Sequence, residues 1–440
     1  MPTLPPGPRS TLRTTFDIAR KPYEAMLELR RRYGDPFSCS TINGPVVSTA
    51  EPELIRELFT HKDTALFEPF ASAAMTPFFG ASSLLLLEGE AHRRERKLLT
   101  PPFHGERMRT YGEIMASAAR MAAKALAPGQ AFTGLELGQR ISLEVIVRAV
   151  FGVEDAARVH EHTDALIHTL DAALPIFMFA TAFQKAPLGL GPWAKYRRAS
   201  AKVDELLFRQ IAEVRPRAAG REDILSLMLQ ARYEDGEPMS DEHVRDELRT
   251  LLIAGHETTA ITLAWALERV HRDPAVLERL LAELDGSEGS AEALAKLPYL
   301  GAVIDETLRL SPVVEVVFRK LARPWRFGGY DLPAGVAIAP AINLVHMRED
   351  LYPEPERFRP ERMLERKPGP FEYLPFGGGH RRCIGAAFAH YEARIALGTV
   401  LREWSLALRE PGPVAVVRRS VTLGPKTGVR MAMLGPRASN

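Results

Sequence analysis

Residues Phe376 to Gly385 read FGGGHRRCIG, and this stretch decides how the rest of the 440-residue chain is interpreted. It places Cys383 at the end of a glycine-rich loop, directly before a segment from Ala386 in which apolar residues recur at helical spacing. A helix N-terminus and the free backbone N–H groups of such a loop stabilise a negatively charged sulfur. Glycines also let the backbone approach a flat ligand closely. The pattern favours a thiolate over the alternative of a plain buried cysteine beside a turn.

Upstream of this loop, the segment DETLRL carries Glu306 and Arg309 three residues apart. On a helix this spacing places both side chains on one face, where they can pair. A surface ion pair is the alternative interpretation, and such a pair contributes only ~0–1 kcal/mol.

Nearer the N-terminus, GEAHRRERKLLTPPF places His92 and Arg96 four residues apart. Residues at this spacing share a helical face, and both side chains can donate a hydrogen bond to a carboxylate. The neighbouring Arg93, Arg94 and Lys97 are expected to face solvent, and a wholly solvated basic face is the alternative for the segment.

A long helix is predicted to begin near Ser240. Ser240 suits the N-cap, Asp241 and Glu242 favour the positive end of the helix dipole, and Pro274 lies just beyond the other end. About 30 residues at ~1.5 Å each give a length of roughly 45 Å, enough to cross the molecule.

The interior of this helix reads AGHETT at residues 254–259. A glycine inside a helix costs roughly 0.5–1 kcal/mol relative to alanine. The presence of Gly255 therefore indicates a function or a contact that offsets this cost. His256 is a metal-ligand residue type, but no partner stands at ligand spacing, and we interpret it as a spacer.

The remaining pattern predicts a mainly α fold with a smaller β-rich portion, of the α+β class. Helical spacing covers approximately residues 52–310 and 386–404, and strand-like alternation with turns covers approximately 36–50, 313–340 and 411–434. The individual strands are expected at Pro36–Ser40, Pro45–Ser48, Val313–Arg319, Tyr330–Leu332 and Gly335–Ala339. Because no repeat or low-complexity linker divides the chain, residues 1–440 are expected to form one domain.

Composition excludes several classes of protein. With 57 basic and 55 acidic residues the formal net charge is +2, which provides no clustered basic excess for binding nucleic acid. Two cysteines, Cys39 and Cys383, cannot build a disulfide framework. The proline-rich stretch Met1–Arg9 has no long apolar run, so neither a signal peptide nor a membrane anchor is predicted. We therefore expect a cytoplasmic protein.

The pattern FGxGxRxCxG at residues 376–385 resembles, position for position, the cysteine-ligand loop of the cytochrome P450 family. The other motifs follow in that family's order, so the resemblance covers nearly the whole chain. It implies the cytochrome P450 fold, with haem b (iron protoporphyrin IX) between the long central helix and the helix after the loop. Cys383 is then the axial ligand and the metal-binding residue, and Phe376, Gly377 and Gly385 belong to the cofactor site.

The same resemblance assigns catalytic roles within residues 254–259. Ala254 and Gly255 would make room for dioxygen beside the haem, and Thr258 with Glu257 would relay protons to the reduced oxygen. A thiolate ligand would favour cleavage of the O–O bond.

Two further sets of residues are implied to hold the structure around the cofactor. Glu306 and Arg309 would form a buried network with Arg357, in the PERF segment at residues 355–358, that locks the loop against the helical core. The haem propionates would be held by four donors: His92, Arg96, Arg319 and Arg381. Each such charge-assisted hydrogen bond contributes on the order of 1.5–3 kcal/mol.

A substrate pocket is implied by position in the family. Its lining would be Phe67, Phe70, Phe78, Phe79, Phe177, Phe179, Val313, Val314, Val317 and Thr422. This largely apolar set suits a lipophilic molecule such as a terpenoid, steroid or fatty acid, although plain hydrophobic core is the alternative for the aromatic residues. Glu315 interrupts an apolar stretch, and we expect it to face solvent or pair with an arginine rather than to anchor a substrate.

The resemblance therefore implies a haem-thiolate monooxygenase that activates dioxygen and hydroxylates or epoxidises a small lipophilic molecule. A peroxygenase, isomerase or C–C coupling enzyme of the same fold is an alternative, against which the intact Glu257 and Thr258 argue. A non-catalytic haem sensor is an alternative of another class.

Electrons are expected from separate chains, a ferredoxin and a ferredoxin reductase. The sequence has no dinucleotide fingerprint opening a βαβ unit and no clustered cysteines for an iron–sulfur centre. A docking face for an acidic ferredoxin would be formed by Arg93, Arg94, Lys97, Arg382 and Arg394. The protein is expected to be a monomer without a nucleic-acid partner.

Overall fold

In the computed structural model, the described residues are 4–41, 44–68, 72–103, 105, 107–179 and 181–437. Helices dominate this part of the chain, which confirms the predicted mainly α class with a smaller β-rich portion. The helices are α1 (Thr11–Arg20), α2 (Pro22–Tyr33), α3 (Pro52–Phe59), α4 (Ser72–Phe79), α5 (Gly89–Leu99), α6 (Arg107–Lys124), α7 (Gly134–Val145), α8 (Ala156–Ala172), α9 (Ile176–Phe179), α10 (Pro192–Val214), α11 (Ile224–Gln230), α12 (Asp241–Arg272), α13 (Pro274–Asp285), α14 (Ala291–Lys296), α15 (Pro298–Leu310), α16 (Ile342–His346), α17 (Glu361–Glu365) and α18 (Ala386–Glu403).

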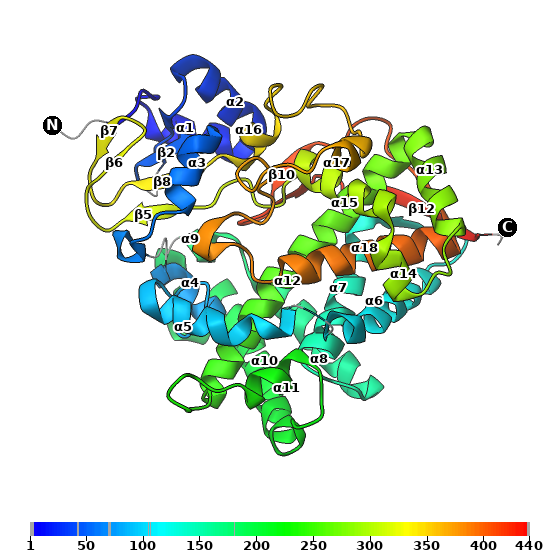
Figure 1. The fold of residues 1–440 in the computed structure, drawn as a ribbon. Helices are drawn as coiled ribbons and strands as arrows, with labels where there is room; N and C mark the ends of the chain where they lie inside the picture. The colour runs from blue at the N-terminus through cyan, green and yellow to red at the C-terminus, as the bar shows by residue number, and fades with distance from the viewer. Residues whose placement is uncertain are drawn as a thin grey trace.

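The strands form small sheets. They are β1 (Phe37–Ser38), β2 (Val46–Thr49), β3 (Phe67–Glu68), β4 (Ala131–Thr133), β5 (Arg319–Leu321), β6 (Trp325–Phe327), β7 (Tyr330–Leu332), β8 (Ala337–Pro340), β9 (Trp404–Leu408), β10 (Val416–Arg418), β11 (Leu423–Pro425) and β12 (Arg430–Pro436). The largest sheet has the order β1-β2-β8-β5-β3, in which β2 and β8 are parallel. A second sheet has the order β4-β12-β9. Figure 1 shows the first sheet on one side of the molecule and the helices around α12 on the other.

Helix α12 has the boundaries that the sequence predicts. The Ser240 hydroxyl accepts a hydrogen bond from the His243 backbone N–H (3.2 Å), which satisfies one free donor of the first turn. At the other end Arg269 and Arg272 lie in the last turn, where positive charge suits the helix dipole. The helix packs against α7, α10, α15 and α18, and it forms the axis around which the helical part is arranged.

The predicted strand over Val313–Arg319 is wrong for all but its last residue, because β5 begins at Arg319. The backbone before it bonds to two different parts of the fold. The Val313 carbonyl accepts from Leu423 N–H (2.8 Å), and the Glu315 carbonyl accepts from Ile342 N–H (2.8 Å). With partners on separate segments, this stretch crosses between them instead of continuing one ladder.

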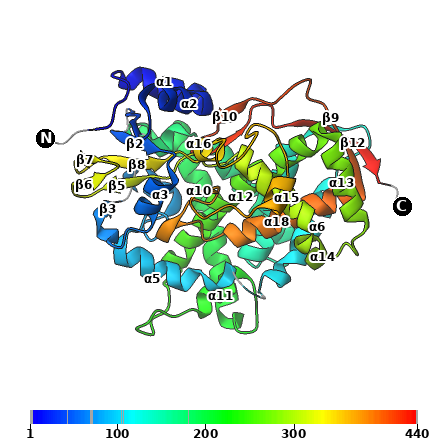
Figure 2. The ribbon, with the colours of Figure 1, turned by 45° about the horizontal axis from the view of Figure 1, so that its top comes forward.

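Two short strands lie in the region predicted to be helical. Strand β3 closes one edge of the five-stranded sheet by pairing with β5, and β4 pairs with β12 near the C-terminus. Strand β9 begins at Trp404, where the sequence predicts the end of a helix. Figure 2 shows β9 and β12 at the opposite end of the molecule from β6 and β7.

Three hydrophobic clusters form the interior of the described part of the chain. The largest is built by α6, α7, α12, α15 and α18, the second lies between the five-stranded sheet and helices α2, α3 and α16, and the third joins α4, α9 and α10. The cysteine loop lies where the first two clusters meet, since Leu374 belongs to the sheet cluster and Phe376 packs on the helical one.

Candidate active site

The cysteine loop is closed by its own backbone. The Cys383 N–H donates to the Phe376 carbonyl (2.9 Å), and the Gly377 N–H donates to the Leu374 carbonyl (2.9 Å). Gly377 and Gly379 have φ values of +64° and +67°, a left-handed conformation that carries no steric penalty for glycine. The loop thereby presents Cys383 as an exposed side chain three residues ahead of α18.

One side of this loop is packed against Phe59 at the end of α3. A Cβ atom at Gly378 would lie 2.2 Å from the Phe59 ring, and one at Gly379 would lie 2.5 Å from the Phe59 carbonyl oxygen. At Gly385, in contrast, a Cβ atom would meet nothing within 4 Å. At position 385 there is therefore room for a flat ligand close to the backbone. At positions 378 and 379 glycine is needed because a larger residue would collide with α3.

The two cysteines have different surroundings. Cys39 is 4% exposed and lies 3.3 Å from the Ser48 hydroxyl, and burial raises the pKa of its thiol to about 11. The Cys383 sulfur is accessible, yet the surrounding protein partly desolvates it and raises the pKa of its thiol, while the Gly385 N–H and the cations Arg96 and Arg382 act to lower that pKa. A metal ion at the exposed Cys383 sulfur would deprotonate it outright.

Small residues leave space beside the middle of α12. Ala254 is exposed although it is halfway along this largely buried helix. A Cβ atom at Gly255 would have its nearest neighbour, Ile146 Cδ1, at 3.7 Å. His256 is buried, and burial lowers its pKa to about 4, so it is a neutral packing residue as expected of a spacer.

The hydroxyl of Thr258 lies on this open side of α12. It donates to the Ala254 carbonyl one turn earlier (2.7 Å) and remains accessible. Glu257 points to the C-terminal segment, where its two carboxylate oxygens lie 3.2 Å from Arg419 Nε and 3.2 Å from the Thr422 hydroxyl. Thr422, predicted to line a pocket, thus contacts the acid of the predicted proton relay, and Arg419 is a partner that sequence reasoning missed.

The four predicted propionate donors converge beside the loop. His92 is 3% exposed, and burial together with the charges of Arg381, Arg96 and Arg319 lowers its pKa to about 3. Burial, and then the repulsion of Arg381, lowers the pKa of Arg319 to about 10. Glu88, 2.7 Å from Arg381, is the acid that pairs with these cations in the described part of the chain. The local excess of positive charge fits an anionic group with two carboxylates.

Arg319 and Arg381 also brace the surrounding backbone. Arg319 donates to the carbonyls of Phe318 (2.9 Å) and Gly378 (3.2 Å), and Arg381 donates to the carbonyl of Leu87. A guanidinium has five N–H donors, so both arginines retain donors for a ligand. An accessible thiol on a glycine loop, small residues on α12 and this cationic cluster together fit a haem.

The predicted network around Glu306 exists, but its third member is Arg362 and not Arg357. Glu306 and Arg309 have no exposed side-chain surface and form two hydrogen bonds of 2.8 and 2.9 Å. Arg362 is 7% exposed and donates to Glu306 Oε1 (2.9 Å). The Arg357 side chain is 64% exposed and pairs with Glu354, so its contribution is the backbone carbonyl that faces Arg309 and Arg362.

The network reaches the cysteine loop through His346, which sequence reasoning missed. Arg309 donates to the His346 carbonyl (2.8 Å), and His346 Nδ1 lies 3.0 Å from the Arg309 carbonyl. Burial lowers the pKa of His346 to about 3, so its neutral Nε2 accepts the Leu374 N–H (2.9 Å). Leu374 in turn accepts from Gly377 of the loop. The buried charges are thereby coupled to the position of the loop.

Most aromatic residues predicted for the substrate pocket are core residues instead. Phe78, Phe79 and Phe177 are 1–4% exposed and pack in one cluster with Trp193 and Tyr196. Ring centroids within it lie 4.7 Å (Phe78 to Tyr196) and 5.1 Å (Phe177 to Trp193) apart. These rings therefore pack against one another as part of the hydrophobic interior.

The other predicted pocket residues have mixed outcomes. Phe67 is buried in the sheet cluster and packs beside Trp325, with ring centroids 6.2 Å apart. Phe70 and the side chain of Phe179 lie outside the described residues. Val313 is buried, Val314 is half-buried, and Val317 lies against the cysteine loop, where a Cβ at Gly377 would be 3.4 Å from its Cγ1.

Glu315 pairs with an arginine, as expected, but it does not face solvent. It is 4% exposed and accepts a hydrogen bond from Arg418, while burial raises the pKa of its carboxyl group. The pair ties the crossing segment at residues 313–318 to β10.

Comparisons with known proteins agree with this arrangement. The family model described as "Cytochrome P450" matches residues 2–429. Putative cytochrome P450 135B1 of Mycobacterium tuberculosis is 36% identical over 440 residues, covering 99% of this chain and 92% of the relative. Putative cytochrome P450 138 of the same species is 35% identical over 442 residues, with 98% and 96% covered.

Solved structures give the same result. Retinoic acid-bound cyanobacterial CYP120A1 superposes with a TM-score of 0.85 at 25% identity and covers 99% of this chain and 100% of that one. The haem domain of cytochrome P450DA superposes with a TM-score of 0.84 at 24% identity, covering 99% and 97%, which supports the fold. No helix in the described ranges is long and apolar enough to cross a membrane.

Proposed function

The chain belongs to the cytochrome P450 family and is a haem-dependent monooxygenase, and from that premise we propose how its own residues hold and use the cofactor. The cofactor is haem b, bound between α12 and the loop before α18. Cys383 is its axial ligand. The observation that carries this assignment is the exposed Cys383 thiol on a loop that the buried Glu306 network fixes in place.

His92, Arg96, Arg319 and Arg381 hold the haem propionates. The support is the surplus of buried positive charge beside the loop, where Glu88 balances only part of it. Two carboxylates at this place would compensate the remaining cations, and burial would strengthen each contact.

When bound, the haem would activate dioxygen, one atom of which enters the substrate while the other leaves as water. Thr258 orients and passes the proton that this chemistry needs, since its hydroxyl is anchored to the Ala254 carbonyl and open on its other side. Glu257, the residue before Thr258, is the acid that returns a proton to the Thr258 hydroxyl. Its contacts with Arg419 and Thr422 hold its carboxylate toward the C-terminal segment.

The substrate is a lipophilic small molecule, such as a terpenoid, steroid or fatty acid, that is hydroxylated or epoxidised. Two apolar residues support this substrate class: Val317 lies beside the cysteine loop, and Ala254 lies on the open side of α12. The related CYP120A1 was solved with retinoic acid bound, which is a ligand of this chemical kind.

Electrons come from a separate ferredoxin with its reductase. Arg382 is exposed beside Cys383 and suits an acidic partner, whereas Arg93 is exposed on α5 but already pairs with Glu90 (2.9 Å). Arg94 and Lys97 are less suitable than the sequence suggests, because Asp235 and Glu234 pair with them at 2.5 Å each. Arg394 is half-buried and donates to the Ala295 carbonyl (3.1 Å), so we remove it from the docking face.

The reduced, carbon-monoxide-bound spectrum of Cys383→Ala tests the assignment. The wild-type protein should show the band of thiolate-ligated haem, and Cys383→Ala should lose it together with all NADPH-dependent product formation. Cys39→Ala is the matched control and should keep both, because Cys39 is buried in the sheet cluster. Retention of the band in Cys383→Ala would show that another group ligates the iron.

A further inference from the structure

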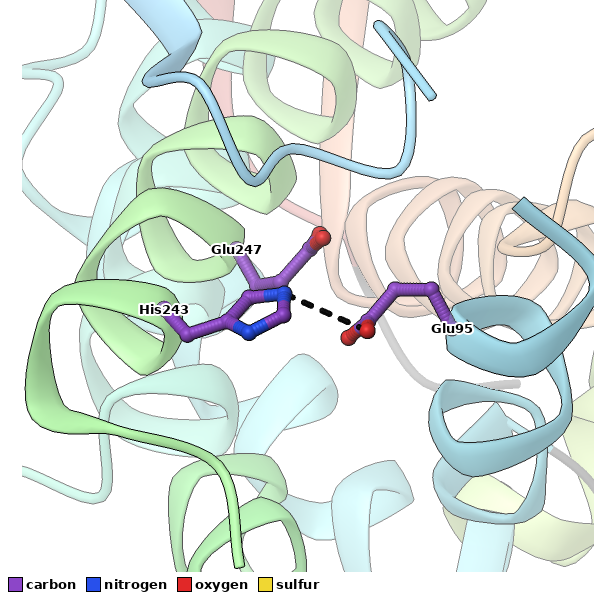
Figure 3. Close-up of side chains that lie close together, drawn as sticks. All are labelled: Glu95, His243 and Glu247. Carbon is purple, nitrogen blue, oxygen red and sulfur yellow. Dashed lines mark ion pairs between the residues drawn. The ribbon is translucent and has the colours of Figure 1, made fainter. Parts of the chain in front are cut away.

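Outside the haem site, three side chains from two helices meet in a compact buried cluster (Figure 3). Glu95 comes from α5, and His243 and Glu247 come from one face of α12. Glu95 and Glu247 are 2% and 1% exposed, and one potential ligand atom from each of the three side chains lies within 4.8 Å of the others. His243 Nε2 is 3.2 Å from Glu95 Oε2.

With both carboxyl groups ionised, the charges of this cluster do not balance. Two buried carboxylates would share one histidine, and burying an ion costs several kcal/mol unless an opposite charge compensates it, which is why burial and the charge of Glu95 raise the pKa of Glu247. The nearby arginines of α12 are engaged elsewhere, since Arg245 pairs with Asp246 (2.8 Å) and Arg249 pairs with Asp204 (2.8 Å). Within the described residues, His243 is the one base paired with either carboxylate.

Two atoms of the cluster also lack hydrogen-bond partners among the described residues. Glu95 Oε1 is buried with no donor, and His243 Nε2, although close to Glu95, is not aligned for a hydrogen bond. A histidine nitrogen and carboxylate oxygens that converge at one point are among the usual ligands of Zn²⁺.

Tyr233 would orient both sides of such a site. Its hydroxyl lies 3.3 Å from His243 Nδ1 and donates to Glu95 Oε2 (2.8 Å). If His243 donates its Nδ1–H to Tyr233, then Nε2 carries the lone pair that a metal needs, and such outer contacts are typical of metal-binding histidines. Glu247 is held similarly by the Leu84 N–H (2.6 Å).

We propose that Glu95, His243 and Glu247 bind one divalent cation of the Zn²⁺ type, which joins α5 to the start of α12. A neutral histidine and two carboxylates would compensate its two charges. Ligand atoms about 2.0–2.2 Å from a tetrahedral ion lie roughly 3.3–3.6 Å apart, so binding requires the cluster to contract by about 1 Å. A water would complete the tetrahedral shell, and the ion would fix α5, which carries the proposed propionate donors His92 and Arg96, relative to α12.

Zinc binding to the haem-loaded protein tests the proposal, because haem occupies Cys383 and removes the most exposed thiol from competition. After treatment with a chelator and dialysis against Zn²⁺, the wild-type protein should retain one more ion per chain than His243→Ala or Glu247→Gln. His160→Ala is the control, since His160 and Asp164 form an exposed pair at the same helical spacing and 3.2 Å apart. It should bind as the wild type does.

Two further measurements make the result independent of folding defects. Tyr233→Phe keeps all three ligands and should raise the dissociation constant for Zn²⁺ about 10–100-fold. X-ray absorption at the zinc edge should give a shell of nitrogen and oxygen at about 2.0–2.2 Å. Equal zinc content in the wild type and both ligand variants, or a sulfur shell at about 2.3 Å, would overturn the proposal.

Discussion

At the scale of single residues, Thr258 shares a hydrogen-bond pattern with Thr250 and Thr262 of α12 but differs from them in its surroundings. Thr250, Thr258 and Thr262 each donate to the carbonyl four residues earlier, at 2.7–2.9 Å. Thr250 and Thr262 are 7% exposed, whereas the Thr258 hydroxyl is accessible. The local bond therefore satisfies the hydroxyl proton in all three residues, and only the position of Thr258 beside Ala254 makes it available for chemistry.

Thr258→Ala should fold and bind haem and substrate almost normally, but it should form less product per NADPH consumed. Without the hydroxyl, more oxygen leaves as hydrogen peroxide and less enters product, and a loss of ~1.4 kcal/mol on the productive branch changes the partition about tenfold. The measurement is product and peroxide formed per NADPH consumed. Thr262→Ala removes an equivalent hydroxyl one turn away and should leave this ratio unchanged. Unchanged coupling in Thr258→Ala would mean that Thr258 is a packing residue.

At the scale of elements, the error over Arg357 shows what local sequence leaves open. Residues 355–357 and 360–362 both read Pro-Glu-Arg, so the motif alone permits either arginine. The choice is made by α17, which packs against α15 and directs Arg362 inward to Glu306, while Arg357 lies in the preceding turn. Glu306 and Arg309 were predictable because their spacing depends on one helix, but their third partner depends on the packing of two.

Arg362→Ala should yield little folded haem protein. It would leave Glu306 buried with one cation fewer, and breaking a buried ion pair costs about 3–5 kcal/mol. Arg357→Ala removes an exposed side chain and should change stability by no more than about 0.5 kcal/mol. Haem content and the midpoint of thermal unfolding distinguish the two variants. A reversed order of stability would return Arg357 to the network.

The contact between α7 and α12 depends on a glycine that the sequence did not single out. A Cβ atom at Gly138 would lie 2.8 Å from the Ala260 carbonyl oxygen and 2.9 Å from its Cα, both backbone atoms that cannot turn aside. Ala260 is two residues from Thr258, so the spacing of the two helices also determines the position of the proposed proton relay.

Gly138→Ala should therefore destabilise the protein, although alanine favours a helix by about 0.5–1 kcal/mol over glycine. Forcing α7 away from α12 has a cost typical of an overpacked core, about 1–3 kcal/mol. Gly286→Ala is the control, because at this helix end a Cβ atom would find its nearest neighbour at 3.6 Å. Thermal unfolding should begin at a lower temperature in Gly138→Ala and remain near the wild-type value in Gly286→Ala. Equal stability of Gly138→Ala and the wild type would show that the helices can separate freely.

At the scale of the whole molecule, the sequence predicts the helical bulk better than the sheets. The long helix, the cysteine loop and the mainly α class follow from patterns confined to a few turns of chain. Strands β3 and β4 contain two and three residues and pair with segments about 250 and 300 residues away. They are too short to show an alternation of apolar and polar residues in the local sequence. The aromatic residues Phe78 and Phe177 suggest a pocket in the sequence but pack in a buried cluster with α10, because burial is a property of the assembled helices.

The helical core also buries an acid that none of the proposed roles requires. Glu392 of α18 is 2% exposed, and its Oε1 has no hydrogen-bond partner among the described residues. Burial raises the pKa of its carboxyl group from 4.5 to about 8, and the Ser142 hydroxyl offsets this only in part. At neutral pH the folded protein therefore holds Glu392 protonated, while the unfolded chain releases that proton.

Stability should depend on pH accordingly. Below pH 4.5 both states are protonated and the neutral carboxyl contributes its full stability. Between pH 4.5 and about 8 only the unfolded state ionises, so stability falls by up to ~1.4 kcal/mol per pH unit, and above pH 8 the contribution is lost.

Glu392→Gln cannot ionise, so its unfolding temperature relative to the wild type should rise between pH 5 and pH 8. Comparing the two proteins at each pH cancels the titration of all other groups, and the exposed Glu113→Gln should show no such trend. A constant difference between Glu392→Gln and the wild type across this range would mean that the folded protein ionises Glu392 as readily as the unfolded chain does.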